Sequence, residues 1–232
     1  MVTTKRKPKN SLKSDPMFAN FKRIEGMTDN QDDMIESFRQ GLNVVAVGSA
    51  GTGKTYVAMA LALEAIADGR ATKIVLIRSA VATRDIGFLP GTEAEKMAVY
   101  EQAFSGIVNE LLGRGDAYQL LKQKGAIEFH SSSFLRGVTI KDAIIVVDEI
   151  ANYNQHEMQT ILSRVGDNTR VILMGDFRQC DLNSRHDTTC LPWLMKVVDR
   201  MDDYMEVVEF GHDDIVRSGF CKAFILACES IS

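Results

Sequence analysis

The sequence predicts an α/β fold in which helices cover both faces of a mostly parallel β-sheet. Short apolar runs that end in glycine or in acidic residues alternate along the chain with Ala- and Leu-rich segments of helical periodicity. The Val-rich run at 43–47 is the clearest example, because it stops at Gly48 and is followed by a helix-forming stretch at 54–68. Continuous apolar runs of this length are typical of parallel strands that are buried on both faces.

The other elements keep the same alternation. A helix is predicted over 28–40, where Met34, Ile35 and Phe38 recur at helical spacing before Gly41. Further strands are predicted at 73–78, 126–130, 143–147 and 169–174, and an edge strand at 205–210. Further helices are predicted at 93–123 (interrupted near Gly113 and Gly115), 156–165, 191–198 and 219–230.

The composition indicates a folded chain with one substantial core, since 45% of the 232 residues are hydrophobic and 25% are charged. Residues 1–23 carry seven basic side chains and one acid, which predicts a basic flexible arm over 1–24 and a single domain over 25–232. No apolar run approaches the roughly 20 residues of a membrane span, and the N-terminus lacks the apolar stretch of a secretory signal. We therefore expect a cytoplasmic protein without a membrane partner, and its four cysteines, which form no C-x-x-C pair, are expected to be reduced thiols.

The strongest motif is a glycine-rich loop between the first predicted strand and the helix that follows it. It reads Gly48-Ser49-Ala50-Gly51-Thr52-Gly53-Lys54-Thr55 and matches G-x-x-x-x-G-K-[ST] without departure. Glycines let successive backbone N–H groups point inward, where they bind a β-phosphate together with the positive end of the helix. Lys54 is expected to reach the β- and γ-phosphates of a nucleotide, and the Thr55 hydroxyl to ligate Mg²⁺.

A second motif is an apolar strand that runs directly into two acids, Asp148 and Glu149. A buried parallel strand delivers such residues to its carboxyl end, where ligands bind in open α/β sheets. We expect Asp148 to support Mg²⁺, and Glu149 to orient or deprotonate the attacking water.

Two glutamines complete the predicted site. A third apolar strand ends in Gly175-Asp176-Phe177-Arg178-Gln179, and the neutral amide of Gln179 is expected to sense the γ-phosphate. Gln31 lies 17 residues before the phosphate loop, and a glutamine amide can bond N6 and N7 of adenine together. A reader of this kind selects ATP over GTP, and the alternative for Gln31 is an ordinary helix-surface residue.

The order of these motifs resembles the core of superfamily 1 helicases and, more narrowly, the PhoH family of phosphate-starvation-inducible ATPases. The narrower resemblance rests on segments between the motifs, namely Gly87-Phe88-Leu89-Pro90-Gly91, Phe134-Leu135-Arg136-Gly137-Val138-Thr139 and Asp213-Asp214-Ile215-Val216-Arg217. It covers about residues 25–225, and the compact form is similar to stand-alone phage versions of the family.

The resemblance implies a RecA-like P-loop fold, hydrolysis of ATP with Mg²⁺, engagement of RNA or single-stranded DNA, and a homo-oligomer such as a hexameric ring. One such domain supplies half of a helicase ATP site, so an arginine from a neighbouring subunit is expected to complete it. Arg217 is the first candidate for this arginine and Arg178 is the second. For either residue the alternative is a surface salt bridge.

A nucleic-acid face is expected at two strand ends, where related helicases contact the backbone of a bound strand. Such contacts position a strand without reading its sequence. The candidate residues are Arg78, Ser79, Thr83 and Arg84 after one strand, and His130, Ser131, Phe134 and Arg136 after another. The alternative is a pair of ordinary polar loops.

Three functions remain open on the sequence alone. The first is an ATP-driven motor that binds or remodels RNA or single-stranded DNA. The second is a nucleotide-gated assembly or protein-binding module without unwinding activity. A nucleotide kinase is the third and least favoured, because no segment is recognisable as a lid over a phosphate acceptor.

Overall fold

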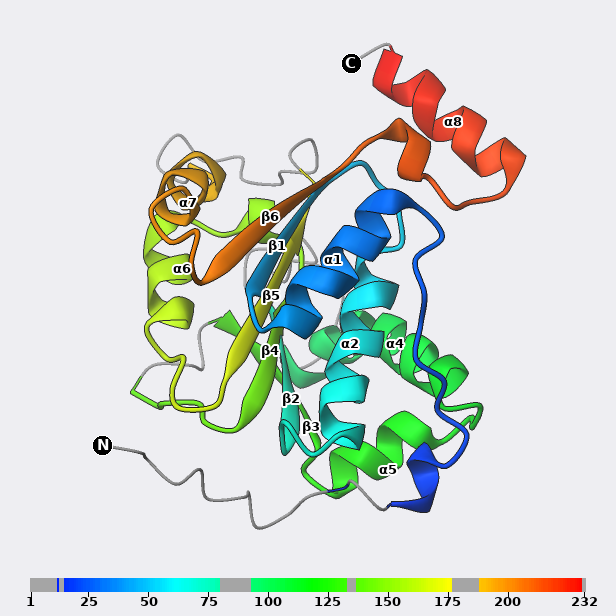
Figure 1. The fold of residues 1–232 in the computed structure, drawn as a ribbon, viewed down its shortest axis with the longest axis vertical. Helices are drawn as coiled ribbons and strands as arrows, with labels where there is room; N and C mark the ends of the chain where they lie inside the picture. The colour runs from blue at the N-terminus through cyan, green and yellow to red at the C-terminus, as the bar shows by residue number, and fades with distance from the viewer. Residues whose placement is uncertain (1–11, 13–14, 80–92, 133–136, 177–187, 231–232) are drawn as a thin grey trace.

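The core of the protein is a six-stranded sheet in which every neighbouring pair of strands is parallel. The computed structural model describes residues 12, 15–79, 93–132, 137–176 and 188–230. The strands, in their spatial order, are β3 (Ile127–Ser131), β2 (Lys73–Arg78), β4 (Ala143–Val147), β5 (Arg170–Gly175), β1 (Asn43–Gly48) and β6 (Met205–Phe210). Figure 1 shows them as one twisted sheet, and the predicted α/β fold is confirmed.

Alternate residues along each strand face two separate hydrophobic clusters, which makes the domain a three-layer structure. In β1, Val44 and Ala46 face one cluster, and Val45 and Val47 face the other. The first layer contains α1 (Asp29–Gln40), α2 (Lys54–Ala67), α4 (Glu93–Leu111) and α5 (Ala117–Gln123). The other face is covered by α6 (Gln155–Leu162) and α7 (Leu191–Val198). Burial on both faces explains why the strands read as continuous apolar runs.

The ends of the elements follow local signals. The helix α1 begins after Thr28, whose hydroxyl accepts the Gln31 N–H, and ends at Gly41 with φ 109°. The helix α6 begins at a capping box, in which Asn154 and Glu157 each accept the backbone N–H of the other. The predicted interruption of the segment 93–123 lies between α4 and α5.

Residues 15–24 belong to the folded body, which moves the boundary expected for the basic arm. Phe18 is buried, and Met17, Phe21 and Ile24 pack against the same cluster. A short 3-10 helix, η1 (Pro16–Phe18), is capped by Asp15. The sequence of this segment has no helix or strand periodicity, so it did not predict this packing. The contacts that hold the segment are made with residues far away in the chain.

The C-terminal helix α8 (Gly219–Ser230) stands apart from the layers at the end of the chain (Figure 1). No residue of α8 is buried, and the side chains of Phe220 and Phe224 are largely exposed. The preceding short helix η4 (His212–Asp214) contacts the start of α1 through a bond from Asn30 Nδ2 to Asp214 Oδ2 at 2.7 Å. Within the described parts of the chain, no helix combines the length and the apolar character needed to cross a bilayer.

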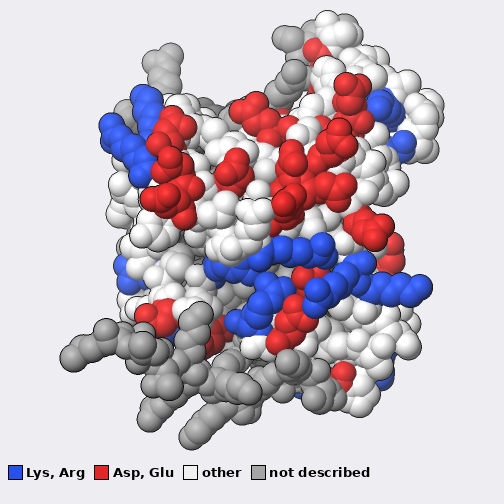
Figure 2. Space-filling view, viewed as in Figure 1, with Lys and Arg blue, Asp and Glu red and all other residues white. Residues whose placement is uncertain are grey.

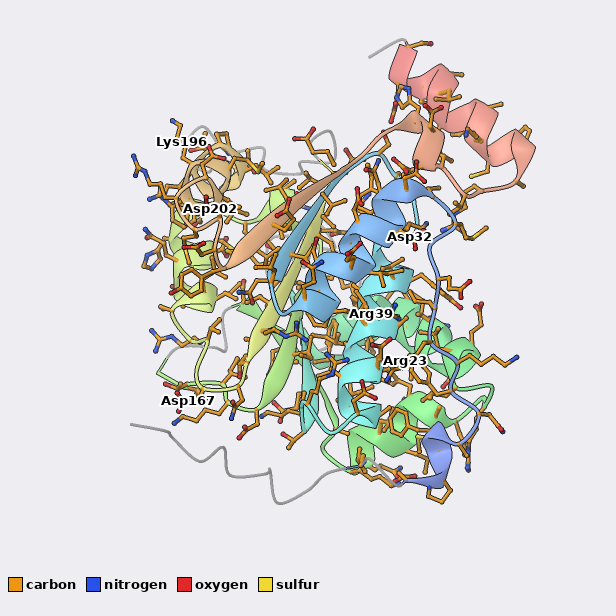
Figure 3. All side chains as sticks on the ribbon, viewed as in Figure 1. Arg23, Asp32, Arg39, Asp167, Lys196 and Asp202 are labelled. Atoms are coloured by element: carbon orange, nitrogen blue, oxygen red, sulfur yellow. The ribbon has the colours of Figure 1, made fainter. Side chains whose placement is uncertain are left out.

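The central helix α2 carries one buried acid, Glu64, on an otherwise apolar surface. Its carboxylate bonds Arg39 of α1 at 2.7 Å and Arg70 at 3.2 Å, and only 3% of the Glu64 side chain is exposed. Arg39 and Arg23 lie over this region (Figure 3), and basic side chains form a band across the same face (Figure 2). These ion pairs balance the buried carboxylate and hold α1 against α2.

We expect Glu64→Ala to lower the free energy of unfolding by about 2 kcal/mol, because it leaves two guanidinium groups without their shared partner. The effect is smaller than for a fully buried pair, since about one third of each arginine side chain is exposed. Urea denaturation followed by circular dichroism measures the change. Glu36→Ala, an exposed acid on α1, is the control and should alter stability by less than about 0.5 kcal/mol. Equal effects of both variants would contradict the role given to Glu64.

Candidate nucleotide-binding site

The phosphate loop leaves β1 in a backbone conformation that requires glycine at its first position. Gly48 has φ +130°, and a Cβ atom there would lie 2.0 Å from the carbonyl oxygen of Phe210. The next residue, Ser49, donates its N–H to that same oxygen at 3.1 Å. The close approach of β6 therefore fixes where the loop turns away from the sheet.

Lys54 lies at the start of α2 and is enclosed by the loop. Its ammonium donates to Gly48 O at 2.9 Å, Ser49 O at 2.7 Å and Thr52 Oγ1 at 3.0 Å. Burial lowers the pKa of Lys54, and the charges of Asp176 and Asp148 partly offset this effect. The loop oxygens thus satisfy the hydrogen bonds of the Lys54 ammonium in the described structure. A phosphate group can replace these oxygens as its partner.

A cavity of about 680 Å³ joins the loop to the carboxyl ends of β4 and β5. Its volume lies within the usual range for small-molecule sites. It is lined by residues 50–55 of the loop and, from other elements, by Gln31, Asp148, Glu149, Asp176 and Arg217. The structure therefore brings the two predicted motifs of the site, the phosphate loop and the acidic strand end, to one cavity.

The acids after β4 differ in their surroundings. Burial raises the pKa of Asp148, while the charges of Arg78 and Lys54 act in the opposite direction. Glu149 has a left-handed backbone with φ 53°, and its N–H donates to Asp148 Oδ1 at 3.0 Å. Left-handed conformations are unfavourable for residues with a side chain, so the turn after β4 is held by its contacts.

A second close approach aligns this turn with β5. A Cβ atom on Gly175 would lie 2.6 Å from Ile150 Cγ1. Glycine therefore lets the end of β5 lie against the short helix η3 (Ile150–Asn152) that follows Glu149. Asp176, the next residue, consequently faces the same cavity as Asp148.

The oxygen donors at this cavity suit a magnesium ion. Thr55, Asp148 and Asp176 all line the cavity, and their side chains carry one hydroxyl and two carboxylates. Mg²⁺ prefers oxygen ligands and is commonly held by one or two carboxylates together with phosphate groups of the substrate. The half-buried Asp148 carboxylate also gains from a cation, because partial burial without one disfavours its charge.

A second hollow, of about 640 Å³, lies between α1, α7 and β6 and is unsuited to a nucleotide phosphate. Five acids line it, and acidic side chains are visible over this part of the surface in Figure 2. These residues are Asp33, Glu36, Asp199, Glu206 and Glu209. Their charges repel polyphosphate, whereas Lys54 attracts it to the first cavity.

Gln31 lines the cavity but already uses both ends of its amide. Its Nε2 donates to Thr52 O at 2.8 Å, and its Oε1 accepts the N–H of Met27 at 3.0 Å. Only 4% of the residue is exposed. In the described structure Gln31 therefore ties α1 to the phosphate loop, and reading adenine would require it to exchange these bonds.

Arg217 faces the cavity of its own chain, which differs from the expected contribution by a neighbouring subunit. The adjacent residue Val216 donates its N–H to Gly51 O at 3.1 Å, and this bond fixes the segment over the phosphate loop. Arg217 lines the same cavity as Lys54. The sequence could not show this, because the contact joins residues that are 165 positions apart. Arg178 and Gln179 lie outside the described residues.

The predicted nucleic-acid residues do not form an exposed face among the described residues. Ser79 and Ser131 are buried, and Ser79 Oγ donates to Asn152 O at 2.8 Å. Arg78 pairs with Glu149, and His130 lies 3.2 Å from a carboxylate oxygen of Glu128. The described part of the predicted face is therefore engaged in contacts within the chain, and its role toward a strand stays a prediction. Thr83, Arg84, Phe134 and Arg136 lie outside the described residues.

Two acids of the site were not assigned a role from the sequence. Asp176 is the foremost of the charges that offset the effect of burial on Lys54, and its position after a predicted strand was the available signal. Asp214 also acts on Lys54 and accepts the N–H of Gly211 at 2.8 Å. It stands in the segment 213–217 that carries the family resemblance, but that segment does not indicate its role, because its place near Lys54 depends on how η4 packs after β6.

Comparison with known proteins places the chain in a family. The family described as "PhoH-like protein" matches residues 23–229. The chain belongs to this family. It is 33% identical to a PhoH-like protein of Mycobacterium leprae over 211 residues, which cover 90% of this chain and 60% of that protein. It is 34% identical to Protein PhoH of Escherichia coli K12 over 183 residues, or 77% of this chain and 51% of that protein.

The chain thus spans a little over half the length of the PhoH relatives it matches. Among solved structures, the large terminase of a thermophilic bacteriophage superimposes with a TM-score of 0.51 and 13% identity. The match covers 84% of this chain and 48% of the terminase. It supports the P-loop NTPase fold that the phosphate loop and the sheet order already indicate.

We expect Gln31→Ala to weaken the binding of ADP and GDP alike, by roughly tenfold, because it removes the hydrogen bond to Thr52 O that holds the phosphate loop and the bond to Met27 N–H that positions Gln31. Fluorescence titration with labelled ADP and GDP measures both affinities. Gln40→Ala, on the exposed face of the same helix, is the control and should leave both unchanged. A loss confined to ADP would instead support the role of Gln31 as an adenine reader.

Proposed function

We propose that this PhoH family member binds ATP with Mg²⁺ and hydrolyses it, and that hydrolysis is coupled to the binding or remodelling of RNA or single-stranded DNA. The observation that carries the first part is the shared cavity of Lys54, Asp148 and Glu149. A cation for phosphate, an acid for a metal and an acid for water are the three groups that this reaction requires.

The phosphate loop binds the triphosphate in this proposal. Backbone N–H groups of residues 48–55 and the start of α2 meet the β-phosphate. Lys54 exchanges its bonds to Gly48 O and Ser49 O for phosphate oxygens. Thr55 and Asp148 hold Mg²⁺, which supplies charge neutralisation for the β- and γ-phosphates when it is bound.

The remaining groups act on the γ-phosphate and on water. Glu149 orients the attacking water and accepts its proton, because it is the second acid that lines the cavity beside Asp148. Arg217, from the same chain, is placed to stabilise charge that develops on the transferred phosphoryl group. Gln179 senses the γ-phosphate, as its place after Gly175 and Asp176 suggests.

We expect Lys54→Ala to abolish nucleotide binding, and Glu149→Gln to keep binding while reducing the turnover number by about 10²–10⁴-fold. Binding is measured with a fluorescent ATP analogue, and turnover by phosphate release. Glu206→Gln, an exposed acid on β6, is the matched control and should retain normal activity. Wild-type hydrolysis by both site variants would refute the assignment.

The uneven distribution of charge along the chain supports the coupling to nucleic acid. The first 23 residues are strongly basic while the rest of the chain is acidic, so a strand would meet a local basic surface. We expect single-stranded RNA or DNA to stimulate ATP hydrolysis severalfold, with stimulation weakening as salt is added. Steady-state assays with poly(U) RNA and with single-stranded DNA test this, and the absence of stimulation by either polymer would contradict it.

A nucleotide-gated assembly is the second candidate, and α8 favours it. Phe220 is 83% exposed and Phe224 is 60% exposed on a helix without buried residues. Apolar surface of this kind is commonly covered by another molecule, and a second copy of the chain in a ring is the occupant we consider. Light scattering of the full chain with and without ATP tests the idea. A nucleotide-dependent oligomer that is lost in Phe220→Ser/Phe224→Ser would support it, and a monomer under all conditions would exclude it.

A further inference from the structure

Arg78 does not line the cavity, but its side chain binds Glu149, the residue proposed as the general base for ATP hydrolysis. It ends β2, the strand next to β4, so its backbone lies beside Asp148, whose N–H donates to Ile77 O at 3.2 Å. The Arg78 guanidinium donates to a carboxylate oxygen of Glu149 and stacks on the ring of Tyr100 of α4 at 4.1 Å. Its side chain is 11% exposed, against 31% for Glu149. Of these two, only Glu149 lines the cavity.

One donor of this guanidinium has no acceptor. The Nε–H of Arg78 is buried and makes no hydrogen bond within the described structure. Buried donors are almost always satisfied, and an exception calls for a ligand or a rearrangement. Arg78 can therefore donate a hydrogen bond to an anion while it still binds Glu149, or can bind the anion instead of Glu149.

The contact also limits what Glu149 can do. A carboxylate oxygen that accepts a guanidinium N–H is not free to accept a water, and ion-paired carboxylates are in general poorer proton acceptors. The left-handed backbone of Glu149 adds strain that this contact helps to hold. Opening the pair would remove this guanidinium from the carboxylate and take away one contact that holds the turn after β4.

We propose that Arg78 restrains Glu149, and that a phosphodiester of a bound single strand competes for the guanidinium and releases the carboxylate for catalysis. Phosphate accepts two parallel N–H bonds from arginine, one of them from the Nε that is now without an acceptor. Arg78 is thus a positioning residue that acts through Glu149. The inference rests on the proposed ATPase function, and it gives a physical route by which a strand stimulates hydrolysis.

Arg78→Gln in the 232-residue chain tests the restraint. We expect the turnover number without a strand to rise by about threefold to tenfold, with a smaller change in KM, because the restraint is worth about one charged hydrogen bond. Stimulation by poly(U) RNA should be lost, since the variant is already released. Arg78→Lys should retain part of the restraint. The control is Arg200→Gln, which replaces an exposed arginine after α7 and should behave as wild type.

Two further variants separate the possible outcomes. Arg78→Gln combined with Glu149→Gln should be as inactive as Glu149→Gln alone, which shows that Arg78 acts through Glu149. If Arg78→Gln does not fold, Tyr100→Leu removes the stacking surface, keeps the charge and should raise basal turnover by about twofold.

A lower turnover number in a folded Arg78→Gln or Tyr100→Leu variant would overturn the restraint, and so would undiminished stimulation by poly(U) RNA in Arg78→Gln. Neither result affects the proposed ATPase function, which fails separately if Glu149→Gln hydrolyses ATP at the wild-type rate.

Discussion

The site depends on the enclosure of one partly buried cation. The Lys54 ammonium lies among loop oxygens, and three carboxylates offset the unfavourable burial of its charge. These acids, Asp148, Asp176 and Asp214, come from the ends of three different strands or the turns after them. A parallel sheet brings such ends to a single edge. The order of the strands therefore determines which acids lie close enough to stabilise the charge of Lys54. A polyphosphate with its metal ion suits this arrangement of one ammonium and three carboxylates. The phosphate groups add negative charge near Lys54, and the metal ion adds positive charge near the carboxylates.

Backbone proximity, as much as side-chain chemistry, sets the geometry of the cavity. Gly48 lets the phosphate loop turn against Phe210, and Gly175 lets the end of β5 lie against Ile150. Each contact joins an element of the site to the next element around the sheet edge. The loop, the acidic turn and Asp176 are consequently positioned relative to one another by rigid strands, as precise chemistry requires.

The sequence predicted the fold well because its strongest signals are local. Apolar strands such as 143–147, the cap at Thr28 and the phosphate loop are all readable within about ten residues. The failures concern contacts between distant segments. Ser79 and Ser131 were expected at a surface but are buried, and Phe18 was assigned to a flexible arm but is buried. No pattern in the sequence reports which distant segment packs on a given residue.

Contacts between distant segments also explain why three residues have partners other than those predicted from the sequence. Gln31 holds the phosphate loop, Arg217 faces the cavity of its own chain, and Arg78 binds Glu149. In each case the residue type predicted a polar interaction, but the tertiary structure determined which group the residue contacts. Because Arg217 is followed closely by α8, the cavity and the exposed apolar helix are linked by a few residues of backbone. The two proposals therefore concern different walls of one cavity: the restraint by Arg78 concerns Glu149 after β4, and the cover over α8 concerns the segment that carries Arg217.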